Sequence, residues 1–444
     1  MTGLVFLSVA HKSRNRTNKN LLLVHNHYRI PGGEDTVVSN EYALLKSMGH
    51  TVTLYERHND EIAGMTGFQR LALPFTFICS KKTAKEITSI IKEKHIDVIL
   101  VHNTLSLISP SVYYAAKKAG IPVLQTIHNF RLICPKATLY RDGHICEDCV
   151  KKGLHCALLH RCYRNSLSQT LVAVISAMIH RKTGIYSYLH YICLTSFNRD
   201  RLLTLPSIIK THTHIKPNFT AVQETIVPYK DRENTFIYAG RLEEQKGTKE
   251  LLNAWYLLET GAKNHEDIPT LDIYGTGPET DYAQKYIEKH GLRRVNLHNP
   301  LPHADIIKTI GKTRALILPT KWYEGFPMTI AEAFGAGTPV IGTDLGNTGD
   351  LIKNTVEGSA KELNKNTVDE KEADHTRTLT TGCFTPLGAL IDPADMEVSL
   401  AHIIEAWDSF TYDIAAFKKA AQKYGEEENR RIFTEILTKI TKKQ

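Results

Sequence analysis

The sequence has no run of about 18 uncharged apolar residues, the length that a membrane-spanning helix requires. Its apolar opening, residues 1–10, has no basic residues before it and runs into a polar, basic stretch, which is unlike a secretory signal. The chain also lacks a strong imbalance of charge, because 55 Lys and Arg accompany 47 Asp and Glu, a net charge of +8 over 444 residues. These absences predict a cytoplasmic protein that does not cross a membrane.

The sequence shows little of what a nucleic-acid-binding surface needs. Basic residues are not gathered into one stripe, and the aromatic residues, 8% of the chain, are not interleaved with them as base stacking requires. We therefore expect no nucleic-acid partner. The eight cysteines and the positive charge leave a zinc-knuckle nucleic-acid-binding protein as an alternative, which salt-sensitive binding to an oligonucleotide would favour.

What the sequence does contain is an alternation of short β-rich runs with stretches of helical periodicity. Such alternation is typical of parallel sheets whose helices cover both faces. Because 444 residues exceed one compact core, and because the pattern restarts after a linker at residues 215–227, we expect an α/β fold with two doubly wound, Rossmann-like domains. The expected strands are residues 21–26, 51–57, 98–103, 123–128 and 191–196, then 235–240, 270–275, 295–298, 315–320 and 339–343.

The same pattern predicts the domain boundaries. The first domain spans residues 1–216 and the second residues 217–414, and a last helix at 415–444 packs back across the domain junction. Two segments interrupt the alternation of strands and helices. Residues 131–164 hold five of the cysteines, whereas residues 353–381 are polar and without periodicity, which predicts a surface insertion.

The strongest chemical signal is the segment WYEGFPMTIAEAFGAG at residues 322–337. A proline at the first turn after a glycine-containing loop begins a helix whose free N–H groups and positive dipole end attract phosphate. Glu324 precedes this helix and Glu332 lies within it, so both carboxylates would face one crevice and accept hydrogen bonds from a hydroxyl-rich ligand. The alternative is a solvated Glu324 and a Glu332 that caps neighbouring backbone.

A second signal is the segment YAGRLEEQKG at residues 238–247, which follows the first strand of the second half. Ligands of open α/β sheets bind at the carboxyl edge of the strands. The guanidinium of Arg241 and the ammonium of Lys246 could hold a diphosphate there and stabilise the charge that develops on it. A surface ion pair of Arg241 with Glu243 or Glu244 is the alternative.

Two weaker signals lie at the ends of strands in the first half. Gly32 and Gly33 follow the first strand and would let a ligand approach the backbone closely, although many such turns simply need glycine. His128, with Asn129 beside it, ends the strand at 123–128 and could handle a proton or a hydroxyl in the crevice. A structural histidine is the alternative.

Taken together, the segments GGED, TIHNFRLICP, YAGRLEEQKG, LDIYGTGPE and WYEGFPMTIAEAFGAGTPVI resemble the retaining GT-B glycosyltransferases of family 4 over nearly the whole chain. Glu324 and Glu332, separated by seven residues, look like the E-x7-E motif of that family. The resemblance implies the GT-B fold, two domains facing a central cleft. It also implies transfer of a sugar, with retention, from a UDP- or GDP-linked donor to a glycan or lipid-linked glycan, without a catalytic metal, in cell-surface polysaccharide biosynthesis.

The resemblance assigns a role to each matching residue. Glu324 would contact hydroxyls of the donor sugar, Glu332 the nucleotide ribose, and His128 the transferred sugar. The groups near the donor phosphates would be Arg241, Lys246, the backbone of Gly325, Phe326 and Met328, and the turn at Gly32 and Gly33. One departure is the turn at residues 346–350, where relatives have Gly-Gly-x-x-Glu and this chain has GNTGD, so donor contacts there are uncertain. A nucleotide-sugar epimerase or a glycogen-type phosphorylase of the same fold is the alternative function.

The cysteine-rich segment predicts a structural zinc site. Cys146 and Cys149 form a CxxC knuckle whose thiolates reach one tetrahedral ion, and two more sulfurs would close the site. A similar insert in a subset of the resembled family favours Cys134, Cys146, Cys149 and Cys162. Competing ligands are Cys156, His144, His155 and His160, and thiols packed in a loop without metal are the alternative.

The segment at residues 167–179 follows this insert and is apolar, with basic residues before and after it. It could lie on a membrane surface near a lipid-linked acceptor, which would make the protein peripheral at the inner membrane. An amphipathic helix packed on the first domain is the alternative.

Overall fold

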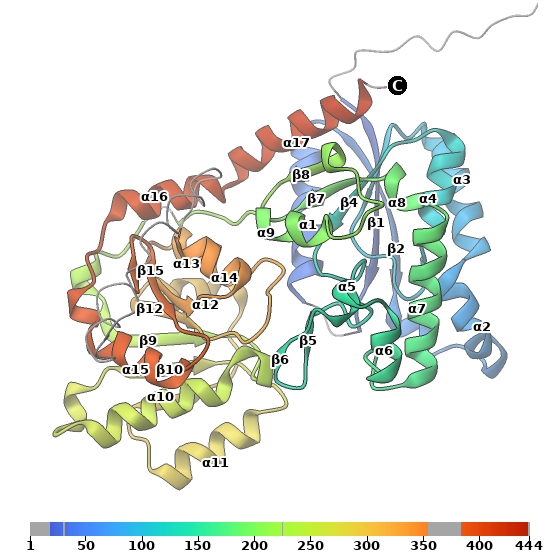
Figure 1. Ribbon diagram of the computed structural model, residues 1–444. Coiled ribbons are helices and arrows are strands. Elements are labelled where there is room, and N and C mark those ends of the chain that lie inside the picture. The colour runs from blue at the N-terminus through green and yellow to red at the C-terminus, as the bar shows by residue number, and fades with distance from the viewer. Residues whose placement is uncertain (1–17, 30–31, 224, 354–382, 443–444) are drawn as a thin grey trace, which may run out of the picture.

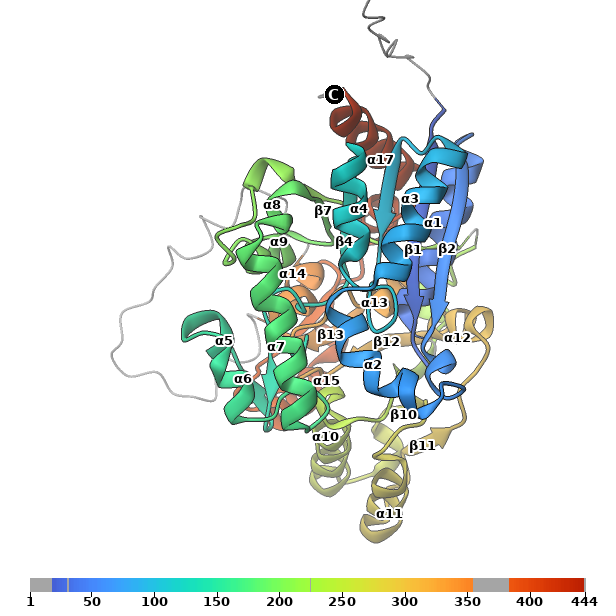
Figure 2. The ribbon, with the colours of Figure 1, turned by 90° about the vertical axis from the view of Figure 1, so that its right-hand side faces the viewer.

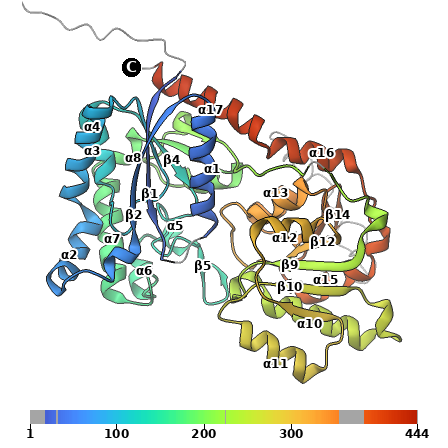
Figure 3. The same ribbon diagram turned by 180° about the vertical axis from the view of Figure 1, so that it is seen from behind.

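The structure is a computed structural model and describes residues 18–29, 32–223, 225–353 and 383–442. Two α/β domains lie side by side, and the C-terminal helix α17 (Glu426–Thr441) runs from the second domain to the first (Figure 1). Each domain is built on a largely parallel sheet with helices on both faces (Figure 3). The prediction of two doubly wound α/β domains is confirmed.

The first domain has a six-stranded sheet in the order β2-β1-β3-β4-β7-β8, with every pair of neighbours parallel. The middle strands are buried along their whole length because helices cover both faces. The strands are β1 (Asn20–His27), β2 (Thr51–His58), β3 (Val98–Val101), β4 (Val123–Ile127), β7 (His190–Cys193) and β8 (Thr213–Ile215). The main helices are α1 (Gly33–Ser47), α2 (Gly67–Ile78), α3 (Lys81–Lys94), α4 (Ser111–Ala119), α7 (Leu167–Lys182) and α9 (Ser196–Leu202).

The second domain has a seven-stranded sheet in the order β11-β10-β9-β12-β13-β15-β14, in which β14 pairs antiparallel with β15. The strands are β9 (Glu233–Ala239), β10 (Thr270–Tyr274), β11 (Val295–His298), β12 (Thr313–Leu318), β13 (Val340–Thr343), β14 (Phe384–Thr385) and β15 (Gly388–Ile391). The helices are α10 (Thr248–Gly261), α11 (Thr280–His290), α12 (His303–Ile310), α13 (Met328–Gly335), α14 (Gly346–Lys353), α15 (Met396–Glu405) and α16 (Ile414–Lys423).

All ten expected strands occur, with ends that differ by at most three residues from the expected ones. Each of them has a run of apolar residues long enough to show its pattern. The sequence pattern does not predict β8, whose three residues are too few for a periodicity to appear.

The first part of the linker between the domains is buried, whereas residues 221 and 222 are exposed. Lys216, Asn218 and Thr220 are all largely inaccessible to solvent, and the Thr220 N–H donates to the Tyr424 carbonyl (3.0 Å). Helix α17 then continues to the first domain, where the Arg430 guanidinium donates to the Ser47 hydroxyl (3.1 Å). The linker and the last helix therefore hold the two domains together.

The cysteine-rich insertion lies between β4 and α7 and contains four short elements. They are β5 (Tyr140–Arg141), β6 (His144–Ile145), α5 (Asp148–Lys151) and α6 (His155–Leu159). The β5–β6 hairpin reaches the second domain, because a Cβ on Gly143 would contact the Glu244 carboxylate at 3.5 Å (Figure 1). The predicted insertion at 353–381 lies outside the described residues except for Lys353, the last residue of α14.

Among the described residues, no helix is both long and apolar enough to cross a bilayer.

Candidate active site

The two domains meet where the ends of β4 and β12 face each other. A Cβ on Gly325 would lie 2.2 Å from the carbonyl oxygen of His128, so only glycine allows the second domain to approach this closely. A cavity of about 210 Å³ opens at this junction. Six of the predicted site residues line it: Gly33, His128, Glu324, Gly325, Phe326 and Met328.

Glu324 is buried and holds three hydrogen bonds through one carboxylate oxygen. Its Oε1 accepts from Lys246 Nζ (2.6 Å), Trp322 Nε1 (2.9 Å) and Thr320 Oγ1 (3.2 Å). The solvated Glu324 of the alternative interpretation is therefore wrong. The structure brings Glu324 and Lys246 together as an ion pair, which gives the cleft an acidic and a cationic group side by side.

Arg241 lies in the loop after β9, at the same edge of the sheet. Its side chain is 61% exposed and pairs with Glu243 Oε1 (2.5 Å), the surface ion pair that the alternative describes. This loop packs against the loop after β12, because a Cβ on Gly247 would lie 1.8 Å from the Pro319 carbonyl oxygen. Because the Arg241 side chain itself is exposed, solvent weakens this ion pair, while the backbone of Arg241 stays beside the Glu324 loop.

Glu332 is buried within α13, the helix that begins at Met328. A hydrogen bond of 2.8 Å joins its Oε1 to Nε2 of His303, which begins α12 and is largely exposed. No sequence pattern singles out His303, since one imidazole at a helix start has no distinguishing spacing. The structure adds it as a partner that orients the Glu332 carboxylate.

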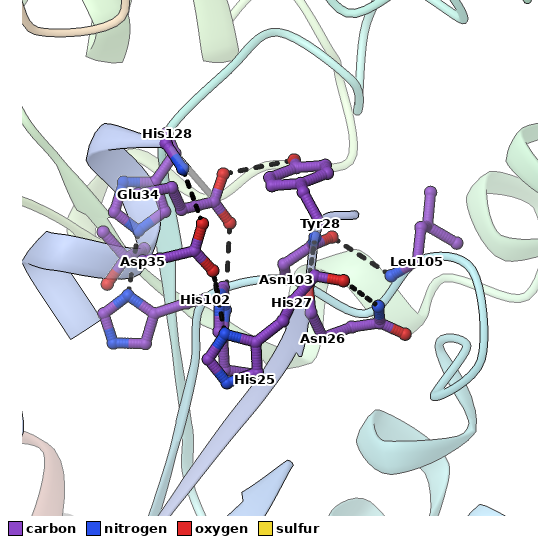
Figure 4. A network of polar contacts seen from close by, with 12 residues as sticks. His25, Asn26, His27, Tyr28, Glu34, Asp35, His102, Asn103, Leu105 and His128 are labelled. Carbon is purple, nitrogen blue, oxygen red and sulfur yellow. Dashed lines mark hydrogen bonds and ion pairs between the residues drawn. The ribbon is translucent and has the colours of Figure 1, made fainter. Parts of the chain in front are cut away.

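His128 is the first member of a buried chain of charged and polar groups (Figure 4). Its Nε2 lies 2.8 Å from Nδ1 of His102, whose Nε2 lies 3.3 Å from Glu41 Oε1. Glu41 in turn pairs with Lys216 (3.2 Å), and Lys216 donates to the Asn429 side-chain oxygen in α17 (3.1 Å). Burial, followed by the neighbouring His102, holds the pKa of His128 well below its usual value. A neutral imidazole therefore faces the cavity.

The turn at Gly32 and Gly33 begins α1 beside the same cavity. A Cβ on either glycine would meet nothing within 4 Å, so neither glycine is required by contacts within the protein. The Asp35 carboxylate accepts from the Gly32 N–H (2.9 Å) and fixes the turn. Glu34 also lines the cavity, and burial raises its pKa to about 7.

Asp35 also joins two histidines of β1 (Figure 4). His25 Nε2 and His27 Nδ1 both lie within 3.0 Å of Asp35 Oδ1. In the described part of the chain, these three side chains form the one group of metal-ligating atoms that all lie within 4.8 Å of one another. Their hydrogen bonds account for this arrangement, and we assign no ion to it.

Two asparagines that the sequence analysis did not select hold the Glu324 loop across the domain junction. Asn198 of α9 donates to the Gly325 carbonyl (2.7 Å). Asn347 of α14 donates to the Glu324 carbonyl (2.6 Å) and to the Asn198 side-chain oxygen (2.6 Å). Residues 346–350, the expected turn that departs from the family pattern, begin α14, and Asn347 among them positions the Glu324 loop.

The cysteines of the insertion gather in one region. Burial and the neighbouring thiols of Cys134 and Cys162 raise the pKa of Cys149 to about 12. The sulfurs of Cys134, Cys146, Cys149 and Cys162 do not all lie within 4.8 Å of one another. The zinc site stays a prediction.

Comparison with known proteins identifies the second domain. Residues 223–375 match the family described as Glycosyl transferases group 1, and this segment contains Arg241, Lys246, Glu324 and Glu332. The chain is 31% identical over 119 residues to a glycogen synthase of Mycobacterium tuberculosis, a match that covers 27% of this chain and 28% of that enzyme. It is 32% identical over 149 residues to a lipopolysaccharide 1,6-galactosyltransferase of Salmonella typhimurium. That match covers 32% of this chain and 39% of that enzyme. The matched part is thus less than half of each relative.

The whole chain is similar to solved glycosyltransferase structures. Anabaena Alr3699/HepE in complex with UDP superposes with a TM-score of 0.58 at 16% identity, over 95% of this chain and all of that one. The two-domain architecture is therefore the GT-B fold.

Proposed function

We propose that this protein is a retaining glycosyltransferase of family 4, which moves a sugar from a UDP- or GDP-linked donor to a glycan or lipid-linked glycan. The observation that carries the proposal is the ion pair of the half-buried Lys246 with the buried Glu324, which lines the interdomain cavity beside the first turn of α13. A cation for phosphate, a carboxylate for sugar hydroxyls and the free N–H groups of a helix start match the parts of a nucleotide sugar.

The residues of the cleft suggest how the transfer would proceed. Arg241 and Lys246 would stabilise the diphosphate as its bond to the anomeric carbon breaks, while the acceptor oxygen forms the new bond on the same face. The acceptor proton would pass to the leaving phosphate. Glu324 and the neutral His128 would hold hydroxyls of the transferred sugar, and Glu332 those of the ribose. In this proposal Arg241 and Lys246 stabilise the charge on the leaving diphosphate, so that the reaction needs no metal ion.

The acceptor belongs, in this proposal, to cell-surface polysaccharide biosynthesis on the cytoplasmic side of the membrane. The similarity to a lipopolysaccharide galactosyltransferase supports this role, as does a match of 23% identity over 75% of the chain to a protein of the cps region of Klebsiella pneumoniae. The cleft lies between the domains, where an acceptor held by the first domain meets a donor held by the second.

A thermal-shift screen of UDP, GDP and ADP tests donor binding. One of these nucleotides should stabilise the protein by about 3 kcal/mol at a concentration of 100 times its Kd, because it binds the folded state alone. Addition of an acceptor should then be required for release of the nucleotide from its sugar, which separates transfer from epimerisation. Stabilisation by oligonucleotide and by none of the nucleotides would contradict the proposal.

We also propose a structural zinc ion at Cys134, Cys146, Cys149 and Cys162. Metal analysis of the purified protein should find about one zinc per chain, since a closed four-thiolate site binds zinc tightly. A Cys146→Ser/Cys149→Ser variant should lose the metal, whereas Cys383→Ser, a matched change in the second domain, should keep it. A metal-free native chain that does not take up added zinc would show packed thiols instead.

A further inference from the structure

Helix α7 exposes its large apolar side chains and buries small ones. Ala173, Val174 and Ser176 face the protein, whereas Met178 is 57% exposed on the opposite side. A helix that packs on a soluble domain normally buries its large apolar residues. The side chains exposed along α7 are Leu167, Leu171, Ile175, Met178 and Ile179.

Helix α2 continues this surface. It packs beside α7, as Figure 2 shows, and Phe77 anchors it through an edge contact with Tyr163. Phe68, Leu71 and Phe75, spaced to share one side of the helix, are 85%, 76% and 75% exposed. We call the exposed side chains of α2 and α7 together the apolar face. An apolar surface of this size on a soluble domain marks a contact with another apolar phase.

The charges around the apolar face have one sign. No Asp or Glu occurs in residues 62–85 or in residues 149–199. Exposed basic residues border the two helices at Arg70, Lys81, Arg161, Arg164 and Lys182. None of these five forms an ion pair within the part of the chain that the structure describes. A protein partner would usually present charges of both signs, whereas an anionic bilayer offers negative head groups above an apolar interior.

We propose that the apolar face docks the first domain on an anionic lipid bilayer, with α2 and α7 lying in the interface and the basic residues among the head groups. Both helices contribute, so the docking surface is wider than the segment at 167–179 that the sequence singled out. The aromatic side chains of α2 would enter the boundary between head groups and acyl chains.

The cysteine-rich insertion joins this surface to the cleft. It connects His128, at the cavity, with the start of α7, and the Arg181 guanidinium at the other end of α7 donates to the Leu132 carbonyl (2.6 Å). Docking would therefore hold the first domain, and with it one wall of the cleft, at the membrane surface, where a lipid-linked acceptor lies. The use of such an acceptor rests on the proposed function, whereas lipid docking itself does not.

Co-flotation of the full chain with vesicles of phosphatidylglycerol and phosphatidylcholine tests the docking. The native protein should float with mixed vesicles and much less with phosphatidylcholine alone. A Phe68→Ser/Phe75→Ser variant should bind about a hundredfold more weakly, since removal of each buried large apolar side chain changes an equilibrium roughly tenfold. Arg161→Glu/Arg164→Glu should reduce the preference for the anionic vesicles.

The matched control is Leu257→Ser/Leu301→Ser, which removes two partly exposed leucines of the second domain and should leave flotation unchanged. All variants should keep the thermal shift with nucleotide, so that a failure of docking is distinct from a failure of the proposed function. Equal flotation of native protein and the α2 variant would overturn the proposal. So would a native dimer that the same substitutions dissociate, because the apolar face would then be covered by a second copy.

Discussion

Glu332→Ala should weaken nucleotide binding by roughly ten- to a hundredfold. A hydrogen bond to a charged group contributes about 1.5–3 kcal/mol, and every 1.4 kcal/mol is a factor of ten in affinity. Glu332 is buried in α13 with one oxygen held by His303, so its carboxylate has a fixed orientation in which to accept from the ribose hydroxyls of the proposed donor. The measurement is the Kd of the stabilising nucleotide by calorimetry.

Two further variants separate this role from a structural one. Glu332→Gln keeps an oxygen acceptor without the charge and should lose less affinity than the alanine variant. Glu288→Ala, an exposed glutamate of α11 in the same domain, should bind nucleotide as the native protein does. Unchanged affinity in the Glu332→Ala variant would remove Glu332 from the site.

Lys216→Met should destabilise the protein by roughly 3–5 kcal/mol, because it leaves Glu41 charged and buried without its partner. The double variant Glu41→Gln/Lys216→Met should recover much of this loss, since no isolated charge remains. Arg431→Met is the matched control: it removes an exposed ion pair of α17 and should leave the unfolding free energy nearly unchanged. Denaturant-induced unfolding measures the free energy of unfolding of all three variants.

The Glu41–Lys216 ion pair also makes the stability of the protein depend on pH. Burial alone would raise the pKa of Glu41, but the charges of Lys216 and His102 overcome it and lower the pKa from 4.5 to about 2. A lowered pKa stabilises the folded state fully above the ordinary value and loses this contribution as the pH falls from 4.5 through 2. The double variant should therefore lose less stability than the native protein between these values, and an equal loss would contradict the assignment.

The fold could be predicted because its strands carry long buried runs. The candidate residues of the second domain could be selected because they lie within contiguous segments, although their roles stay predictions. The Lys246–Glu324 pair joins two such segments at adjacent strand ends, which the parallel order of the sheet brings together. The buried chain behind His128 has no contiguous signal, because Glu41, Lys216 and Asn429 come from distant parts of the sequence.

Some of these buried polar groups nevertheless have a recognisable pattern in the sequence. Three strands of the first half end in an apolar residue followed by His-Asn, at His25, His102 and His128, and neighbouring parallel strands would bring these ends together. Glu41 lies on the apolar side of α1, between Val38 and Leu45, where a charge needs a buried partner. Asn347 and His303 have no such sign, because only the tertiary structure brings them to partners that are distant in the sequence.

The position of α17 has a consequence for biosynthesis. Both sheets, and with them Glu41 and Lys216, are present in the nascent chain before the ribosome makes Asn429, the hydrogen-bond partner of Lys216. Until α17 docks, Lys216 lacks its hydrogen bond to Asn429, and the contacts of α17 with the first domain are not made. The order of translation thus delays the docking of the two domains on each other until α17 has been made.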